Sequence, residues 1–416
     1  MSSQLRTALA LTPLYLTLCV FSEGGLITDS LWGDVGHYEG FARRILDGDL
    51  PYGDFTVEYP PFALPAFLAP ALVTSTAPDY LFAFKLLMAG LGVVVLVATG
   101  YSLGRLHATR ATTFAGLGTI ALAPLLLGHV FLNRYDLWPA ALVALAVAGY
   151  LSQRDGIASG LLAASFAAKI FTAAMLPLAA GRVLQTGGSR SLVRSAAVFT
   201  AVCVAIFAGF LVTAFGGLGF SYWTQASRDL HGESLPGSVL LVLDTVGTYS
   251  ARIVPGDPGS LDLAGRLPTT LASLTTVLAA GAIGWVWFAC RRSLASDAVF
   301  VTGLTASALA FLAFAKVISP QFLTWLLPLV PLIAGRAGRA CAALLVASMI
   351  LTQFELLGWE GLHVAPWAAW LLLVRNVLLV VLFAVVAREL TKLVSRPYVS
   401  SSASSRSTRV RRSATS

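Results

Sequence analysis

The chain has 416 residues, of which 57% are hydrophobic and only 12% are charged. Soluble domains carry about 25% charged residues, so this composition excludes a soluble enzyme and a nucleic-acid-binding protein. The formal net charge of +8 is also local, because seven Lys or Arg and one Glu in residues 388–416 supply +6 of it.

Apolar stretches recur along the whole chain and predict an all-α polytopic membrane protein. About 20 apolar residues in a helix cross the hydrocarbon layer of a bilayer. Reading the sequence in such windows predicts about 12 transmembrane helices. They lie near residues 7–23, 60–77, 80–103, 112–127, 137–151, 157–180, 195–216, 269–289, 297–315, 317–334, 338–355 and 366–387.

The basic segments predict the orientation. An even number of spans places both termini on one side, and the Arg-rich end of the chain places that side in the cytoplasm. Segments 182–194, 291–292 and 336–339 then also lie inside, whereas segment 105–110 falls outside, against the same rule. We expect a multi-pass domain of residues 1–387 in the cell membrane, followed by a basic, disordered cytoplasmic tail of residues 388–416.

Two polar segments, residues 24–59 and 216–268, are long enough to be functional external loops. In this topology 16 of the 20 acidic residues are external, including Asp155 and Glu355, whereas Asp136 is internal. The length of the loops accounts for part of this bias. The rest favours chemistry at the external face.

Residues 34–46 of the first loop predict a short helix on the membrane surface. Its apolar residues recur at helical spacing: Val35, Tyr38, Ala42 and Ile45. Asp34, at the head of this helix, shares the apolar face with Tyr38. Partial desolvation raises the proton affinity of a carboxylate, which suits a general base. The alternative is that Asp34 only caps the helix.

Lysines in or beside apolar spans are costly and tend to be functional. Lys316 lies at the external end of a span and is either a phosphate ligand or an interfacial anchor. Lys169 lies deeper and either binds a ligand or forms a buried ion pair with Asp136. Arg228 and Glu233, in the second loop, are either solvated charges or ligand contacts.

Several short motifs resemble those of glycosyltransferase family 87. The first loop holds Asp34-Val-Gly-His-Tyr38 and Glu58-Tyr59-Pro60-Pro61. The later pieces are Tyr135-Asp136 with Pro139, Lys169 with Pro177, Glu233-Ser-Leu-Pro236, and Ser319-Pro-Gln321-Phe322 with Trp325 and Pro328, in which Phe322 replaces a tyrosine. Together these pieces extend over nearly the whole chain.

The resemblance implies a GT-C glycosyltransferase fold with two long external loops. Members of the family, which include mannosyltransferases that act on phosphatidylinositol mannosides, take a sugar from a polyprenyl phosphate and invert its anomeric carbon. We therefore expect a polyprenyl-phosphate sugar donor, with mannose as the first candidate for the sugar, a lipid or glycan acceptor, and membrane lipids as partners, and no nucleic acid. The resemblance carries the catalytic base over to Asp34.

The remaining candidate residues divide by chemistry. Cations would hold the donor phosphate: Lys316, Lys169 and Arg228. Polar and aromatic side chains would form the donor and acceptor pocket: Tyr38, Glu58, Tyr59, Glu233, Gln321 and Trp325. For Tyr59 and Trp325 the alternative is the interfacial aromatic belt. The pair Asp47-x-Asp49 is a weak metal signal, and we expect no obligatory metal and no cofactor.

A multi-pass transporter or lipid-carrier flippase without catalysis is the alternative function. Transporters place ionisable groups near the middle of the membrane and often consist of repeated halves. We find no repeat in this sequence and no Asp or Glu deep inside a span. These features favour an enzyme that acts at the membrane surface.

Overall fold

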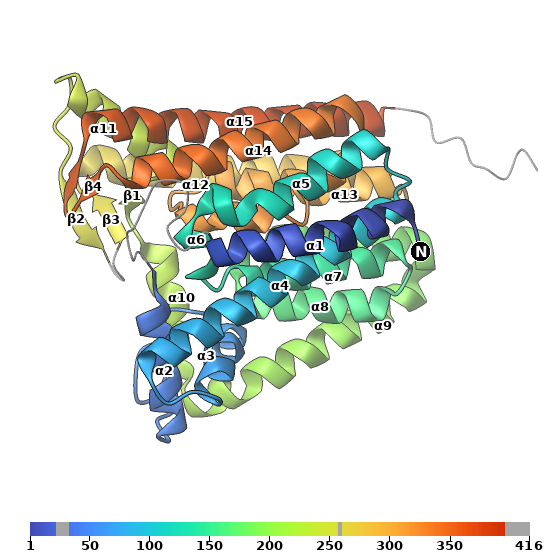
Figure 1. Cartoon of the computed structure of the whole chain (residues 1–416), viewed down its shortest axis with the longest axis horizontal. Coiled ribbons are helices and arrows are strands. Elements are labelled where there is room, and N and C mark those ends of the chain that lie inside the picture. The colour runs from blue at the N-terminus through green and yellow to red at the C-terminus, as the bar shows by residue number, and fades with distance from the viewer. Residues whose placement is uncertain (22–32, 257–259, 396–416) are drawn as a thin grey trace, which may run out of the picture.

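In the computed structural model of the chain, residues 1–21, 33–256 and 260–395 are described, and nearly all their regular structure is helical. Seven helical segments in these ranges are long and apolar enough to cross a membrane. They contain α1 (Ser3–Phe21), α4 (Ala77–Arg105), α5 (Arg110–Leu127), α9 (Leu176–Thr213), α12 (Arg266–Cys290), α14 (Gly335–Leu356) and α15 (Pro366–Val394). They run roughly along the long axis of the molecule (Figure 1).

Shorter apolar helices fill the spaces between the long ones: α7 (Leu137–Leu151), α8 (Asp155–Ala168) and α13 (Asp297–Ala313). Helix α13 is buried along almost its whole length, because it packs against α9, α12 and α15. The chain between α13 and α14 forms two 3-10 helices, η4 (Pro320–Leu326) and η5 (Val330–Leu332). The expected span 317–334 is therefore not one regular helix, since its prolines interrupt the backbone hydrogen bonds.

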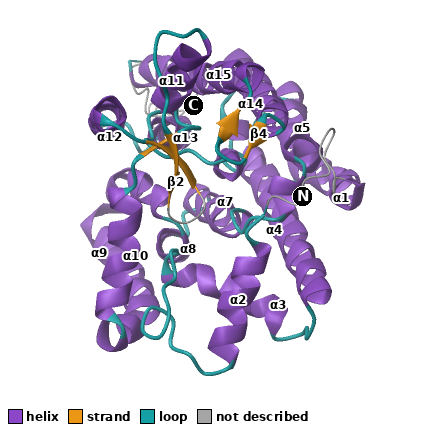
Figure 2. Cartoon of the chain, turned by 90° about the vertical axis from the view of Figure 1, so that its left-hand side faces the viewer, coloured by secondary structure: helices purple, strands orange, loops and turns teal. Residues whose placement is uncertain are grey.

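The two ends of the molecule differ. The N-terminus and the end of α15 lie at the right-hand end in Figure 1, whereas the strands lie at the left-hand end. Figure 2 faces this left-hand end, which also carries four short helices. They are α2 (Val35–Leu46), α3 (Leu64–Ala71), α10 (Phe215–Ser227) and α11 (Leu235–Thr245).

Two small antiparallel sheets complete the strand-bearing end. Strands β1 (Leu230–His231), β3 (Ser260–Leu263) and β2 (Ile253–Gly256) pair in that order. Strands β4 (Trp359–Glu360) and β5 (His363–Val364) form a hairpin between α14 and α15. The second loop is thus a folded segment of helices and strands rather than an extended connection.

Helix α2 confirms the helix that the spacing predicts for the first loop. Val35, Tyr38 and Ala42 are buried on one face. Asp34 occupies the position before the helix, but its side chain makes no capping hydrogen bond. The interpretation of Asp34 as a simple cap is therefore wrong.

The expected span 60–77 does not have the length of a transmembrane helix. It contains η2 (Pro61–Ala63) and α3, of three and eight residues. At 1.5 Å per residue these cover about 16 Å, roughly half of the hydrocarbon layer. Consequently segment 105–110 lies beside the N-terminus, where Gln4 Nε2 donates to the Ala108 carbonyl at 2.7 Å. The expectation that segment 105–110 lies on the opposite side is wrong.

Because segment 60–77 does not cross, Asp136 and Asp155 each lie at the end of the molecule opposite to the one predicted. Asp136 Oδ1 lies 3.1 Å from Lys169 Nζ, at the strand-bearing end rather than at the end of the N-terminus. Asp155 begins α8, and Lys169 follows the end of that helix. About 20 Å of helix therefore separates Asp155 from Lys169. Glu355, counted as an external acid in the sequence, is fully buried in the last turn of α14.

Three expected boundaries also change. The span 157–180 is interrupted at Lys169, which is extended (φ −158°) between α8 and the 3-10 helix η3 (Ile170–Met175). The basic segment 182–194 is helical, and the chain turns within it at Gly188, whose φ of +73° suits glycine. Helix α15 continues to Val394, past the expected start of the tail, and residues 396–416 of that tail lie outside the described residues.

Candidate active site

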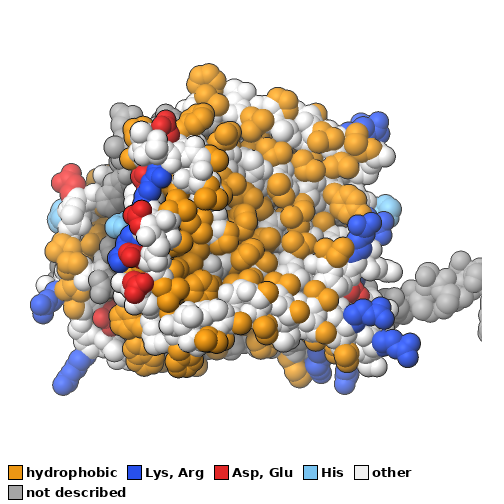
Figure 3. All heavy atoms as spheres, turned by 90° about the horizontal axis from the view of Figure 1, so that it is seen from below, with side chains coloured by type: hydrophobic (Ala, Val, Ile, Leu, Met, Phe, Trp, Pro, Cys, Tyr) orange, Lys and Arg blue, Asp and Glu red, His pale blue; other side chains and the backbone are white. Residues whose placement is uncertain are grey.

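The strand-bearing end contains a cavity of about 590 Å³. Nine of the ten predicted site residues line it: Asp34, Glu58, Tyr59, Lys169, Arg228, Glu233, Lys316, Gln321 and Trp325. Figure 3 shows acidic, basic and histidine side chains gathered at this end, beside a broad hydrophobic surface. The cavity therefore places polar groups from both long loops at the edge of the apolar part of the molecule.

The Asp34 carboxylate accepts three hydrogen bonds at the edge of this cavity. Its Oδ2 is paired with Arg134 Nη1 and accepts from Tyr59 Oη at 3.1 Å and from Tyr38 Oη at 3.3 Å. The side chains of Asp34 and Arg134 are 24% and 19% exposed. Asp34 is thus oriented by three donors and remains accessible from the cavity.

Tyr38, the tenth predicted residue, lies behind Asp34 and is buried. Its ring stacks on Phe67 at 4.3 Å and meets the ring of Tyr135 edge-on at 5.8 Å. Gly33 permits the adjacent segment to approach, because a Cβ there would lie 2.8 Å from Asn133 Cβ. Packing of α2 against these groups therefore fixes the position of Asp34.

Arg134 is a cavity residue that the sequence analysis missed. It follows α6 (His129–Leu132) and lies in a short polar interruption between the apolar helices α5 and α7. A cation in such an interruption, next to the Tyr135-Asp136 motif, is the signal that identifies it.

Lys169 forms the buried ion pair that was one of its two interpretations. Besides the contact with Asp136, its ammonium lies 4.5 Å from the centre of the Tyr135 ring and 5.5 Å from that of Trp325. Trp325 Nε1 donates to Asp136 Oδ1 at 2.7 Å, and the Trp325 ring stacks on Phe322. Lys169 and Trp325 still line the cavity, so the pair and its aromatic surroundings form part of the wall.

Three ionisable side chains cluster where the second loop meets α13. Lys316 Nζ donates to the Ala226 carbonyl at 2.8 Å, and desolvation lowers the pKa of this ammonium. Desolvation likewise raises the pKa of Glu58, which faces Arg228. Arg228 Nε is buried and has no hydrogen-bond partner among the described residues. A ligand oxygen would satisfy this donor.

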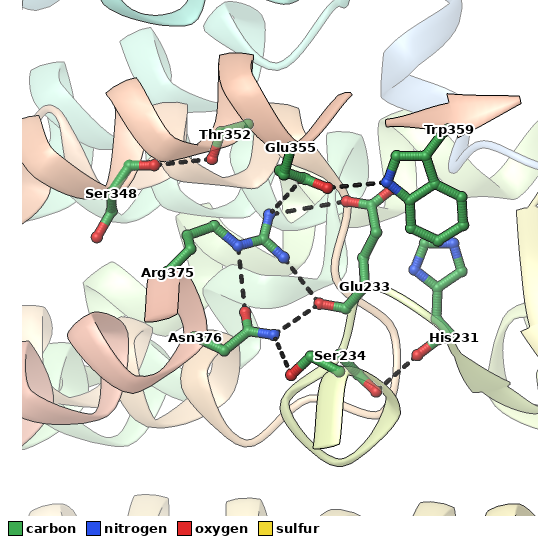
Figure 4. A network of polar contacts seen from close by, with 10 residues as sticks. His231, Glu233, Ser234, Ser348, Thr352, Glu355, Trp359, Arg375 and Asn376 are labelled. Carbon is green, nitrogen blue, oxygen red and sulfur yellow. Dashed lines mark hydrogen bonds and ion pairs between the residues drawn. The ribbon is translucent and has the colours of Figure 1, made fainter. Parts of the chain in front are cut away.

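Glu233 is held by two residues of α15, as Figure 4 shows. The guanidinium of Arg375 lies 3.7 Å from Glu233 Oε2 and 3.4 Å from Glu355 Oε1. Arg375 Nη2 also donates to the Glu233 carbonyl at 2.8 Å, and Asn376 Nδ2 donates to the same carbonyl at 3.1 Å. The sequence analysis missed Arg375, although an arginine inside the apolar stretch 366–387 is the kind of residue that indicates function.

No group of three His, Cys, Asp or Glu residues comes together as a metal site in the described parts of the chain. Asp49, from the weak metal signal, instead forms an ion pair with Arg44 at 2.6 Å.

The model of glycosyltransferase family 87 matches residues 55–320 of the chain, more than half of its length. The chain belongs to glycosyltransferase family 87. The family match includes Glu58, Lys169, Arg228, Glu233 and Lys316. Asp34 and Tyr38 precede the matched residues, whereas Gln321 and Trp325 follow them. No curated protein matches the chain in sequence.

Membership of family 87 and the apolar helices make the protein a membrane glycosyltransferase. This assignment favours the enzyme over the transporter or flippase that the sequence alone left open. A sugar donor and an acceptor are therefore its substrates.

Proposed function

We propose that this family-87 protein transfers a hexose, with mannose as the first candidate, from a polyprenyl-phosphate donor to a hydroxyl of a lipid or glycan acceptor. The observation that carries the proposal is the cavity, which combines the accessible carboxylate of Asp34 with several cations beside a broad apolar surface. A polyprenyl-phosphate sugar has the matching parts. Its chain is apolar, its phosphate is anionic and its sugar is polar.

In the proposed reaction Asp34 acts as the general base. Its carboxylate takes the proton of the acceptor hydroxyl while the acceptor oxygen attacks the anomeric carbon. The bond between that carbon and the phosphate oxygen breaks on the opposite face, so the configuration inverts. The polyprenyl phosphate leaves with the electron pair of that bond.

Cations of the cavity would stabilise the charge that develops on the phosphate. Lys316 and Arg228 are the proposed ligands, and Arg134 is a third. Because Arg134 is paired with Asp34, an incoming phosphate competes for its guanidinium. Donor binding would then release the Asp34 carboxylate to act on the acceptor.

We assign the reaction to the external membrane face and the architecture to the GT-C fold. Support comes from the basic segments, since segment 105–110 and the N-terminus lie together at the end opposite the cavity. By the positive-inside rule that end belongs in the cytoplasm, with both termini. The polar cavity end then faces outward.

The test is transfer of labelled sugar by the purified protein in nanodiscs. Polyprenyl phosphates that carry mannose, glucose or galactose are offered with lipid and glycan acceptors, and the configuration of the product is determined. We expect an inverted product from at least one donor. Absence of transfer from every polyprenyl-phosphate sugar overturns the proposal and leaves the transporter as the better hypothesis.

A further inference from the structure

Two carboxyl groups share one arginine beneath the second loop, and one of them, Glu233, lines the cavity. The side chains of Glu355 and Arg375 are completely buried, and that of Glu233 is 13% exposed, toward the cavity. With both acids ionised, the cluster would carry one uncompensated negative charge. Burial of such a charge costs several kcal/mol, so a group in this position takes up a proton instead.

The other charged groups around Glu233 do not balance this charge. Arg134, from the α6–α7 connection, is already paired with Asp34. Arg228, at the end of α10, also faces Asp262 and Glu58. His231 on β1 is buried, and desolvation lowers its pKa to about 3, so it adds no charge near neutral pH.

The contacts place the proton on Glu233. Glu355 accepts hydrogen bonds from Arg375 and from Trp359 Nε1, the latter at 2.9 Å, and these donors stabilise its anion. Glu233 Oε2 has no hydrogen-bond partner within the described residues. Desolvation, together with the neighbouring Glu355, raises the pKa of Glu233 to about 8.

We propose that Glu233 and Glu355 hold a single proton across Arg375, and that the neutral Glu233 carboxyl binds a hydroxyl of the sugar acceptor. A neutral carboxyl has one O–H donor and one carbonyl acceptor, and a sugar hydroxyl both donates and accepts. Arg375 is a positioning residue, because it holds the side chain and the carbonyl of Glu233. The acceptor part of this inference rests on the proposed function. The shared proton does not.

The shared proton is tested without any sugar transfer. Infrared difference spectra of the full chain in nanodiscs, recorded from well below to well above pH 8, report the carbonyl stretch of protonated carboxyl groups. In the wild type we expect a band that disappears near pH 8. Glu233→Gln removes it, and Glu355→Gln also removes it near pH 8, because Glu233 is then paired with Arg375 alone and ionises at lower pH.

Glu360→Gln is the matched control, since Glu360 is an exposed acid on β4, close in sequence to Glu355. It should leave the titrating band in place. A spectrum without a titrating carboxyl, or a band that persists in Glu233→Gln, overturns the shared proton. Size-exclusion profiles and unfolding temperatures show whether each variant is folded.

The acceptor contact is tested by the pH dependence of KM. Above pH 8 Glu233 loses its donor, so the acceptor KM of the wild type should rise by about three- to tenfold, the worth of one hydrogen bond. In Glu233→Gln this rise disappears, because an amide donates and accepts at every pH. A band that titrates while the acceptor KM stays constant overturns the acceptor contact and leaves the shared proton standing.

Discussion

Two acid–base clusters reach the cavity, and their charges are balanced differently. Asp34 and Arg134 form a pair of one acid and one base, both partly exposed to the cavity. Glu233, Glu355 and Arg375 form a group of two acids and one base, almost completely buried. Both clusters join residues that are far apart in the sequence.

The two clusters differ in whether they can exchange a contact with a ligand or a proton. The Asp34–Arg134 pair is neutral as a whole, and either partner can form a new contact with a ligand, as the proposed reaction requires. The Glu233 cluster has one carboxyl too many, so it holds a proton near neutral pH. Arg375 and Asn376 hold the carbonyl of Glu233 and with it the second loop. The first cluster is therefore suited to chemistry, and the second to positioning. The following variants test this division.

Asp34→Asn should have the largest effect on activity. The amide keeps the shape of the carboxylate but accepts no proton, so we expect kcat to fall by about 100- to 10,000-fold. Sugar transfer from a saturating donor measures this loss. The control is Asp49→Asn in the same loop, whose partner Arg44 lies outside the cavity lining. Wild-type kcat in Asp34→Asn contradicts a catalytic base at this position.

Arg375→Met should have the largest effect on stability. It leaves Glu355 buried without its cation, and breaking a buried pair costs about 3–5 kcal/mol. We expect a lower unfolding temperature in detergent than for the wild type. The double variant Arg375→Met/Glu355→Gln should recover part of the loss, because the uncompensated acid is removed. An unchanged unfolding temperature in Arg375→Met contradicts the structural role of this cluster.

Arg134→Met tests the Asp34–Arg134 pair. The substitution removes a cation that contacts Asp34 and, in the proposed reaction, the donor phosphate. Each hydrogen bond to a charged group contributes about 1.5–3 kcal/mol. We expect kcat/KM to fall by about 10- to 100-fold, with a smaller change in unfolding temperature than for Arg375→Met. Arg105→Met, at the other end of the molecule, is the control. If Arg134→Met mainly lowers stability, the two clusters do not differ as described.

Lys316→Ala should have the smallest effect. Its ammonium is half-buried and hydrogen-bonded to a carbonyl, so its loss should raise the donor KM by about two- to fivefold and leave kcat nearly unchanged. Lys316→Arg, which keeps the charge, should retain most of the affinity. Lys392→Ala, in the distant part of α15, should change neither constant. A loss confined to kcat argues against a phosphate contact.

The sequence was sufficient for the local features of the site. The spacing of Val35, Tyr38 and Ala42 predicts α2, because an amphipathic period depends only on neighbouring residues. The same reasoning places Asp34 on the apolar face, and this position suggested Asp34 as the general base. That role stays a prediction. The cost of a lysine inside an apolar span predicts an acidic partner for Lys169. The structure contains the pair with Asp136 that was one of the two interpretations.

The sequence did not predict which distant residues form pairs or which segments cross the membrane. Arg134 pairs with Asp34 across 100 residues, and Arg375 meets Glu233 across 142. No local pattern encodes such distances. The topology failed at two points. Segment 60–77 hides a short helix after Pro60-Pro61 and does not cross, whereas segment 157–180 divides at Lys169 into two helical pieces. The first error was enough to place Asp136 and Asp155 at the wrong ends.

The contact between α15 and Glu233 has a consequence for biosynthesis. Ribosomes make a chain from its N-terminus, so Asp34, Glu233 and the cations of the cavity are all synthesised before Arg375 and Asn376. Until α15 inserts, the carbonyl of Glu233 lacks the two donors that hold it, and its carboxyl lacks the neighbouring guanidinium. The cavity wall is therefore completed last, and a partly synthesised chain does not yet contain a finished site.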